Sequence, residues 1–294
     1  MLLAVDVGNT QTVVGVFDSA SPVATRDGRA PGEVPGLVRS WRAATVAERT
    51  ADEHALLLSQ LLGLDGLRVR GTGGAGSQPP DDAGGRGLIE GIVFSSSVPA
   101  VAVALRETAA RWFDVPLVVV EPGVRTGMPI LYDNPREVGA DRIADAVAAL
   151  DLFEPPIVVV DLGTATTFDA ISSAGEYLGG AIVPGIEISM DALCASAAAL
   201  PRVALGEPRR AIGRSTVESM QVGAVFGHAA LVDGMCERLE EELGTATVVA
   251  TGGLGGVVAP HSRKVQHLEP WLTLHGLRLL FARNTGRDAD VARP

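Results

Sequence analysis

The alternation of apolar and polar positions repeats in two stretches that lie far apart in the chain. Residues 3–12 read LAVDVGNTQT, and residues 158–167 read VVVDLGTATT. In each stretch an apolar run is followed by an Asp, one apolar residue, a Gly and short polar residues, and then a second apolar run begins. This pattern predicts a buried strand, a tight turn and a returning strand in both places.

The rest of the chain supplies further strands and helices around these two hairpins. In the first half we expect a strand at 37–44, a helix begun by a capping box of Thr50 and Glu53, a strand at 91–95, a helix starting near Pro99 and a strand at 117–120. In the second half we expect strands at 157–161, 166–172, 177–183 and 247–251, and helices at 143–150, after Gly185, near 216–243 and at 271–283.

Three meandering strands followed by alternating helices and strands are typical of the ribonuclease-H-like unit. Two copies of it give an α/β fold with a central interdomain cleft, which by analogy is the fold of the actin, sugar-kinase and Hsp70 superfamily. We expect one such domain in residues 1–124 and the other in 125–294. Residues 71–87 are rich in Gly, with Ser, Pro and Asp, so we predict a disordered insertion there.

The polar residues of the two turns are suited to a phosphate ligand. Asp6 and Asp161 each end a buried strand, where a carboxylate is costly unless a cation or a donor meets it. Gly8 and Gly163 let the backbone approach a ligand and present its N–H groups. One copy alone would be ordinary turn chemistry. Two matched copies indicate two similar domains that face one nucleotide across a cleft.

Composition excludes several classes of protein. Hydrophobic residues make up 47% of the 294 residues, enough for a sizeable core. The net charge of −11 argues against general nucleic-acid or anionic-membrane binding, although a local site for an anionic substrate remains open. The first residues have no basic segment, and Asp6 interrupts their apolar run, so we expect no signal peptide. No stretch is typical of a membrane span, and we expect a cytoplasmic protein.

Asp141 and Arg142 fall at the start of the helix expected at 143–150. An Asp at a helix N-terminus is favoured by the helix dipole, but a cation there is not. At the mouth of an interdomain cleft, the Arg could bind a substrate carboxylate and the Asp could accept a hydroxyl proton. On the residues alone, an ordinary helix start and a site for a polar, anionic substrate both remain open.

The chain resembles the type III pantothenate kinases over nearly its whole length. The motifs that carry the resemblance are DVGNT at 6–10, Tyr132 with Asn134-Pro135, GADR at 139–142, DLGTA at 161–165, GGAIVPG at 179–185, Leu200-Pro201, Gly213 with Thr216, TGGL at 251–254 and LTLHGL at 272–277. No single motif is decisive, but the ordered set is specific. The insertion at 71–87 departs from the usual pattern and lies away from these motifs.

The resemblance implies that ATP and pantothenate give 4′-phosphopantothenate, the first step of coenzyme A synthesis. It implies that Asp141 is the general base, that Asp6 positions magnesium indirectly, and that Asp161 binds a monovalent cation, K⁺ or NH₄⁺. The implied ATP-binding residues are Asp6, Val7, Gly8, Asn9, Thr10, Gln11, Thr12, Val13 and Thr164. The implied pantothenate-binding residues are Tyr132, Gly139, Ala140, Asp141, Arg142 and Thr216. A homodimer, with Thr216 near the subunit boundary, is implied as well.

The residues are compatible with this chemistry, because phosphoryl transfer depends mainly on positioning and charge neutralisation. The chain has no lysine-bearing GxxxxGK[ST] loop, so a monovalent cation could supply part of that charge. Three alternatives remain: another kinase of the superfamily acting on a sugar or a carboxylate, a non-catalytic regulatory relative, and a structural filament former. The presence of Asp6, Asp141 and Asp161 argues against the second, and the small size and the substrate motif argue against the third.

Overall fold

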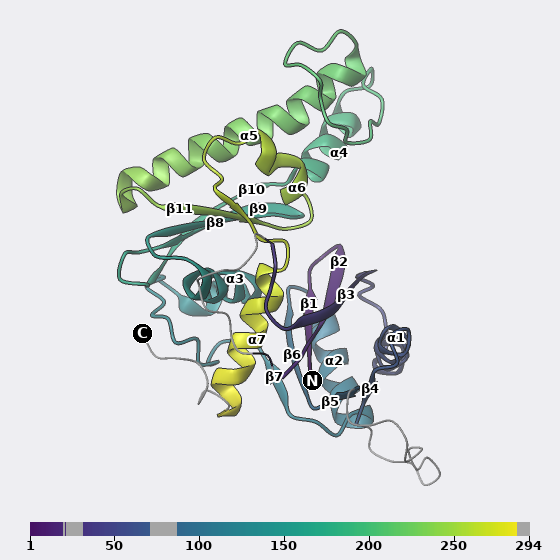
Figure 1. Ribbon diagram of the computed structural model, residues 1–294. Helices are drawn as coiled ribbons and strands as arrows, with labels where there is room; N and C mark the ends of the chain where they lie inside the picture. The colour runs from purple at the N-terminus through teal and green to yellow at the C-terminus, as the bar shows by residue number, and fades with distance from the viewer. Residues whose placement is uncertain (20, 22–31, 71–86, 287–294) are drawn as a thin grey trace.

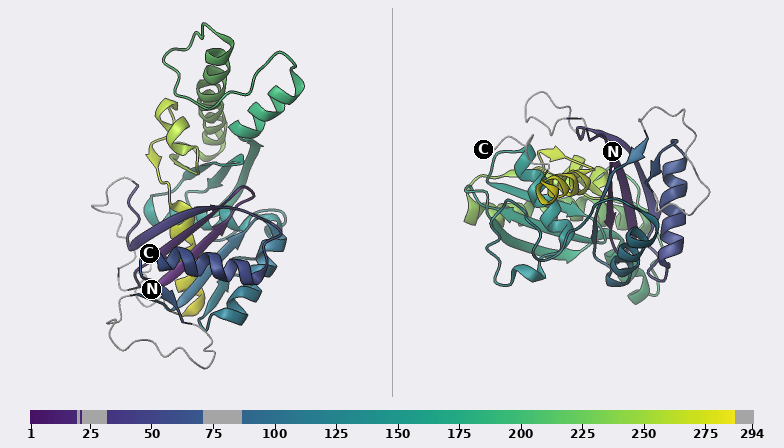
Figure 2. Two further views of the ribbon diagram at one scale, coloured as in Figure 1. Left: turned by 90° about the vertical axis from the view of Figure 1, so that its right-hand side faces the viewer. Right: turned by 90° about the horizontal axis from the view of Figure 1, so that it is seen from below.

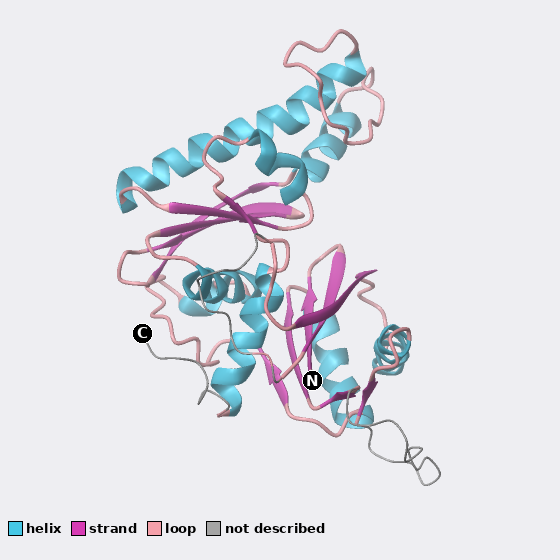
Figure 3. Cartoon of the chain, viewed as in Figure 1, coloured by secondary structure: helices cyan, strands magenta, loops and turns pink. Residues whose placement is uncertain are grey.

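Two five-stranded mixed sheets with the same strand order form the framework of the molecule (Figures 1 and 3). The computed structural model describes residues 1–19, 21, 32–70 and 87–286. In each sheet the first strand of a hairpin pairs antiparallel with its returning strand and parallel with a later strand of the same half. The repeat seen in the sequence is therefore a repeat of topology, and the predicted duplicated fold is confirmed.

The first sheet has the order β3-β2-β1-β6-β7. Its strands are β1 (Leu2–Val7), β2 (Gln11–Phe17), β3 (Leu37–Ala44), β6 (Gly91–Ser96) and β7 (Leu117–Val119). Helices α1 (Ala51–Gly63) and α2 (Pro99–Trp112) pack against one face through a cluster that includes Leu3, Leu58 and Leu105. The predicted capping box of Thr50 and Glu53 begins α1. A short parallel pair, β4 (Arg68–Val69) and β5 (Leu88–Ile89), was not predicted, because each strand has only two residues.

The second sheet has the order β10-β9-β8-β11-β12. Its strands are β8 (Ile157–Leu162), β9 (Ala165–Ile171), β10 (Tyr177–Pro184), β11 (Thr247–Thr251) and β12 (His267–Leu268). The remaining elements of this half are η1 (Pro135–Glu137), α4 (Ile186–Ser196), α5 (Thr216–Leu243), α6 (Gly255–Val258) and η2 (Ala259–His261). Helix α5 covers the outer face of the sheet, where Val232 and Cys236 pack against Val158 and Val248.

Helices α3 (Ala140–Leu152) and α7 (Leu272–Thr285) lie between the two sheets (Figure 2). Every residue of α3 from 142 to 149 is buried, so the helix predicted as amphipathic is enclosed on all sides. Gly276 permits the close approach of α7 to α3, since a Cβ there would lie 1.9 Å from the carbonyl oxygen of Ala144. One continuous core therefore joins the two halves and fixes how their turns face each other.

The predicted domain limits, 1–124 and 125–294, stay a prediction. Residues 129–131 already pair with the second sheet, because the Tyr177 N–H donates to the carbonyl of Pro129 and the Leu131 N–H donates to the carbonyl of Tyr177, on either side of the bridge at Ile130. Helix α7 packs against strands of the first sheet as well as against α3. The predicted disordered insertion at 71–87 lies outside the described residues except for Gly87.

Helix α4 and the first turns of α5 extend beyond the second sheet as an arm that lies away from the rest of the molecule (Figures 1 and 2). We call α4, the loop 197–215 and the start of α5 the helical arm. Several of its large apolar side chains are exposed, namely Ile188, Leu193, Ile212 and Val217. No helix within the described ranges is both long and apolar enough to cross a membrane.

Candidate active site

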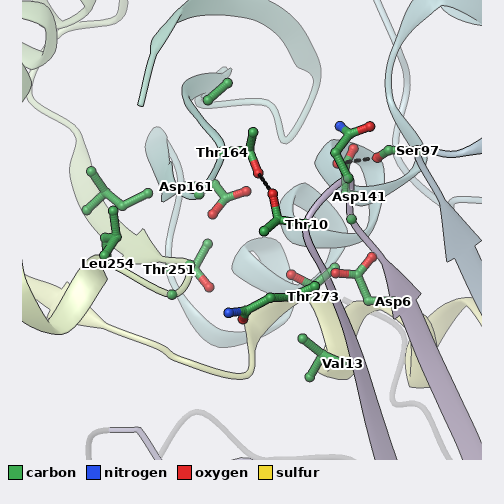
Figure 4. A pocket seen from close by; sticks show the side chains of 18 of the residues that line it. Asp6, Thr10, Val13, Ser97, Asp141, Asp161, Thr164, Thr251, Leu254 and Thr273 are labelled. Atoms are coloured by element: carbon green, nitrogen blue, oxygen red, sulfur yellow. Dashed lines mark hydrogen bonds between the residues drawn. The ribbon is translucent and has the colours of Figure 1, made fainter. Parts of the chain in front are cut away.

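The two predicted phosphate turns meet at the mouth of a cavity of about 370 Å³ between the halves (Figure 4). The hydroxyls of Thr10 and Thr164 lie 2.9 Å apart and form a hydrogen bond across it. Residues from both turns line the cavity, namely Asp6, Gly8, Asn9, Thr10, Gln11, Val13, Asp161, Leu162, Gly163, Thr164, Ala165 and Thr167. Two segments separated by about half of the chain thus form one concave surface.

The turns are similar in sequence but differ by one residue in length, because Asp6 pairs across its hairpin with the residue seven positions later and Asp161 with the residue six positions later. In each turn the Gly N–H donates to a backbone carbonyl, Gly8 to Gln11 and Gly163 to Ala165, both at 3.0 Å. Asp6 lies opposite Val13 in the first hairpin, and Asp161 lies opposite Thr167 in the second. Both carboxylates are therefore placed at the cavity end of a central strand.

Asp6 is held by a residue of the neighbouring parallel strand. Ser95, opposite Asp6 in register, donates its hydroxyl to Oδ1 of Asp6 at 2.7 Å. Burial, together with the charge of Asp141, raises the pKa of Asp6 to about 7, and the Ser95 hydrogen bond only partly offsets this. The carboxylate is held in one orientation, and no cationic side chain among the described residues pairs with it, so a bound metal ion would stabilise it.

Asp161 is in the same electrostatic situation in the second turn. Burial raises its pKa to about 7, and the nearby carboxylates of Asp141, Asp6 and Asp169 add to the effect. Within the described ranges no three His, Cys, Asp or Glu side chains come close enough to form a metal site by themselves. The oxygen-only donors fit Mg²⁺ or K⁺ that completes its coordination with phosphate oxygens, backbone carbonyls or water.

Asp141 lies in the first turn of α3 and points into the cavity (Figure 4). Its Oδ1 accepts the backbone N–H of Arg142 at 2.8 Å, and its Oδ2 accepts the hydroxyl of Ser97 at 3.1 Å. Ser97 belongs to the first half, at the start of the segment that leads into α2. Both carboxylate oxygens therefore have a donor, and one of the donors comes from across the cleft.

Arg142 does not line this cavity. It is buried, and its guanidinium pairs with Asp169 of β9, with Nη2 at 2.7 Å and Nε at 2.8 Å from Oδ1. The Tyr177 hydroxyl donates to the same oxygen at 2.7 Å. Burial raises the pKa of Asp169, and Arg142 offsets part of that rise. The cation at the helix start, unexplained in the sequence, thus neutralises an internal carboxylate.

The other predicted substrate residues lie outside the cavity as well. Tyr132 packs beside Tyr177, with ring centroids 6.4 Å apart, and Gly139 and Ala140 begin α3. Thr216 begins α5 in the helical arm and does not line the cavity. Val7 and Thr12, predicted ATP contacts, are buried in the first sheet. Within one chain the structure therefore gathers the phosphate and base residues but not Thr216.

Sequence reasoning missed Asp145, which lies one helical turn after Asp141. It is almost fully buried, its Oδ1 has no hydrogen-bond partner among the described residues, and Thr273 of α7 hydrogen-bonds to the carboxyl group. Burial, followed by the charge of Asp161, raises its pKa well above the usual range. The i, i+4 spacing of the two acids was the available signal. This spacing alone does not tell a buried acid from an exposed one, and only the packing around α3 shows that Asp145 is enclosed.

A two-domain α/β fold in which two Asp- and Gly-bearing turns and a third aspartate converge on one cleft defines an ATP-dependent kinase of the actin, sugar-kinase and Hsp70 group. The overall fold is similar to a solved Baf family transcriptional activator from Campylobacter jejuni (TM-score 0.53, 18% identity, 97% of this chain and 99% of that one). It is also similar to a ROK family glucokinase from Streptomyces griseus solved with glucose and AMPPNP (TM-score 0.50, 11% identity, 95% and 98% covered). At these identities the similarity shows the fold alone.

The sequence comparisons specify the family. The family model of the type III pantothenate kinases matches residues 2–238. A type III pantothenate kinase from Streptomyces griseus is 49% identical over 292 residues, covering 98% of this chain and all of the relative. One from Myxococcus xanthus is 46% identical over 288 residues, with 97% and 99% covered. The chain belongs to the type III pantothenate kinase family, as its motifs indicated.

Proposed function

We propose that this chain transfers the γ-phosphoryl group of ATP to pantothenate, giving 4′-phosphopantothenate and ADP at the start of coenzyme A synthesis. The observation that carries the proposal is the position of Asp141, whose carboxylate points into the cavity formed by the two phosphate turns. The presence of Asp6, Asp141 and Asp161 in one cleft gives no support to a non-catalytic relative. The family relatives at 46% and 49% identity support the substrate.

In this proposal the two turns bind the phosphates of ATP. Residues 8–11, Val13 and the hydroxyl of Thr164 surround the polyphosphate, and the Thr10–Thr164 hydrogen bond opens to admit it. The carboxylate of Asp6, which the Ser95 hydroxyl holds in place, would orient the magnesium carried with ATP. Magnesium neutralises charge on the phosphates. Val7 and Thr12 support this turn from inside the sheet.

Asp141 acts as the general base. Its free lone pairs accept the proton of the pantothenate hydroxyl while that oxygen forms a bond to the γ-phosphorus and the bond to the β–γ bridging oxygen breaks. The hydrogen bonds from Ser97 and from the Arg142 backbone fix the carboxylate in the orientation needed for this transfer. The proton remains on Asp141 until ADP and product leave.

We infer that pantothenate lies beside the start of α3, between Asp141 and the Tyr132 side chain. Gly139 and Ala140 leave room there, and the Arg142–Asp169 pair forms the buried floor behind them. Thr216, at the start of α5 in the helical arm, does not line the cavity of its own chain, so we infer that it contacts substrate in a homodimer. The exposed apolar residues of the arm support such a dimer. A cytoplasmic location accords with a reaction that consumes ATP.

Asp161 would hold a monovalent cation, K⁺ or NH₄⁺. Its raised pKa supports the assignment, as does the absence of a cationic partner for it among the described residues, because a carboxylate so placed is stabilised by an ion that also offsets phosphate charge. Its position relative to the second turn corresponds to that of Asp6 in the first. The cation would supply charge that a phosphate-binding lysine supplies in other kinases.

A coupled assay of ADP release with and without pantothenate, in Mg²⁺ and K⁺, tests the proposed function. We expect turnover that depends on pantothenate. Asp141→Asn should lower kcat by roughly 10²–10⁴, because an amide of the same shape cannot accept the proton. The matched control is Asp133→Asn, an exposed acid outside the cavity. Wild-type turnover in folded Asp141→Asn would remove the base assignment, and no pantothenate-dependent ADP in wild type would remove the function.

A further inference from the structure

Strand β3 places an arginine at the cavity whose role the assigned site does not explain. Arg42 lies opposite Val13 in the antiparallel pair β2–β3, so the two side chains share one face of the sheet. The preceding residue, Trp41, packs on the opposite face with the cluster under α1 and α2. Arg42 and Val13 both line the cavity between the two halves.

The charges around this cavity are one-sided. Its lining includes the carboxylates of Asp6, Asp141, Asp161 and Glu187. Among the described residues that line it, Arg42 is the only one with a cationic side chain. A nucleotide polyphosphate entering this cavity meets several like charges, and a guanidinium is the protein group best suited to oppose them, because its fork donates to two phosphate oxygens at once.

Contacts from both halves hold the guanidinium in place. It donates from Nη1 to Oε1 of Gln11, at the end of the first phosphate turn, at 3.3 Å. It lies over the ring of Trp271, 5.3 Å from the centroid, just before α7. A Cβ at Gly253 would lie 3.5 Å from its Nη1, which places it next to the turn after β11. Within the part of the chain that the structure describes, Gln11 is the one hydrogen-bond acceptor of this guanidinium, so most of its donors are left for a ligand.

We propose that Arg42 is a nucleotide-binding residue that donates hydrogen bonds to the polyphosphate of ATP. The inference rests on the proposed kinase function for its ligand. In this assignment Trp271 and Gln11 position the guanidinium, and the first sheet contributes a protein cation in addition to the ions at Asp6 and Asp161. The position accounts for a kinase cleft that has acids on both walls and no lysine-bearing loop.

The test compares Arg42→Gln with Arg39→Gln, a control on the same strand whose side chain pairs with Asp65 at 2.8 Å outside the cavity. We expect Arg42→Gln to raise KM for ATP about tenfold, as loss of a charge-assisted hydrogen bond does. KM for pantothenate should change by less than about twofold from the wild-type value, as in the Arg39→Gln control. Arg42→Lys, which keeps the charge but not the fork, should be intermediate.

Calorimetry with Mg-ADP and with adenosine separates phosphate binding from packing. If Arg42 contacts phosphate, Arg42→Gln weakens Mg-ADP binding by about the same factor and leaves adenosine binding unchanged. Equal weakening of both ligands would mean that Arg42 only supports Trp271, and would overturn the proposal. The proposal would also be overturned if Arg42→Gln bound Mg-ADP as tightly as Arg39→Gln does. These binding measurements need no turnover, so they decide the role of Arg42 even if pantothenate proves not to be the substrate.

Discussion

At the scale of residues, carboxylates placed close together in a poorly solvated cleft dominate this site. Burial raises the pKa of Asp6, Asp145 and Asp161, and the charges of neighbouring carboxylates, Asp141 among them, add to the effect. Serines at one strand end provide part of the compensation. Ser95 and Ser97 are two residues apart, so they point to the same side of the chain, and they donate to Asp6 and Asp141 respectively.

Ser97 therefore couples the base to the phosphate-binding half. Its backbone N–H donates to the carbonyl of Val7, directly before the first turn, while its hydroxyl holds Asp141. We expect Ser97→Ala to lower kcat about tenfold with little change in either KM, because the carboxylate loses one of its two donors but no substrate contact. Steady-state kinetics with both substrates varied will measure this.

Ser96→Ala is the control for Ser97→Ala, because the Ser96 side chain bonds only to the local backbone at Val98. Ser97→Thr, which keeps the hydroxyl, should restore most of the rate. A kcat for Ser97→Ala equal to that of Ser96→Ala would contradict a positioning role.

At the scale of elements, one β–turn–β unit is used twice with different partners. In the first copy Asp6 has a serine donor on the parallel strand β6. In the second copy Asp161 lies opposite Thr251 of β11. The same backbone can thus present phosphate-binding N–H groups in both halves, while the residue on the adjacent strand alters the electrostatic environment of the carboxylate.

The position of Asp161 in the second turn predicts that the enzymatic activity depends on a monovalent cation. We expect activity to rise steeply with KCl or NH₄Cl and much less with NaCl, because Asp161 and nearby carbonyls suit a weakly hydrated ion. Asp161→Asn should weaken this dependence together with ATP binding. Each salt is titrated at fixed ionic strength with Mg²⁺ and ATP saturating. Equal rates in all three salts, or full activity without K⁺ and NH₄⁺, would mean that Asp161 only accepts hydrogen bonds.

At the scale of the whole molecule, the layer of α3 and α7 sets the distance between the turns, and the helical arm provides a second surface. Helix α3 is buried on all sides and contacts strands of both sheets, and α7 packs between α3 and the first sheet, so the halves share one core. Val225 and Val232 of α5 are buried within their own chain, so they are not available to a partner subunit. The exposed apolar residues of the arm support the dimer better.

We expect sedimentation velocity to show a homodimer at micromolar concentration. The double variant Leu193→Asp/Ile212→Asp should sediment as a monomer, because a carboxylate in an apolar interface is strongly unfavourable. Val103→Asp, an equally exposed apolar site on α2, is the control and should remain dimeric. Monomeric wild type at this concentration would contradict the dimer. It would also leave Thr216 without a route to substrate.

The sequence by itself determined the local features of this protein. Apolar runs ending in Asp and Gly specified both hairpins, Thr50 and Glu53 specified the start of α1, and the repeat of the hairpin specified the duplicated fold. These depend on residues close together in the chain, so the period of the side chains is enough to indicate them. Two-residue strands such as β12 are defined only by their pairing with another strand, and no local pattern marks them.

Only the tertiary structure decided which distant residues share the cleft. Ser97 meets Asp141 because β6 pairs with β1 in one particular register. Arg42 reaches the cavity because its strand, β3, pairs with β2 in the register that puts Arg42 opposite Val13. Arg142 was expected to face substrate but pairs with Asp169, since packing turned it inward. Such contacts are set by strand register and helix packing over long sequence separations, which the order of residues along one segment does not encode.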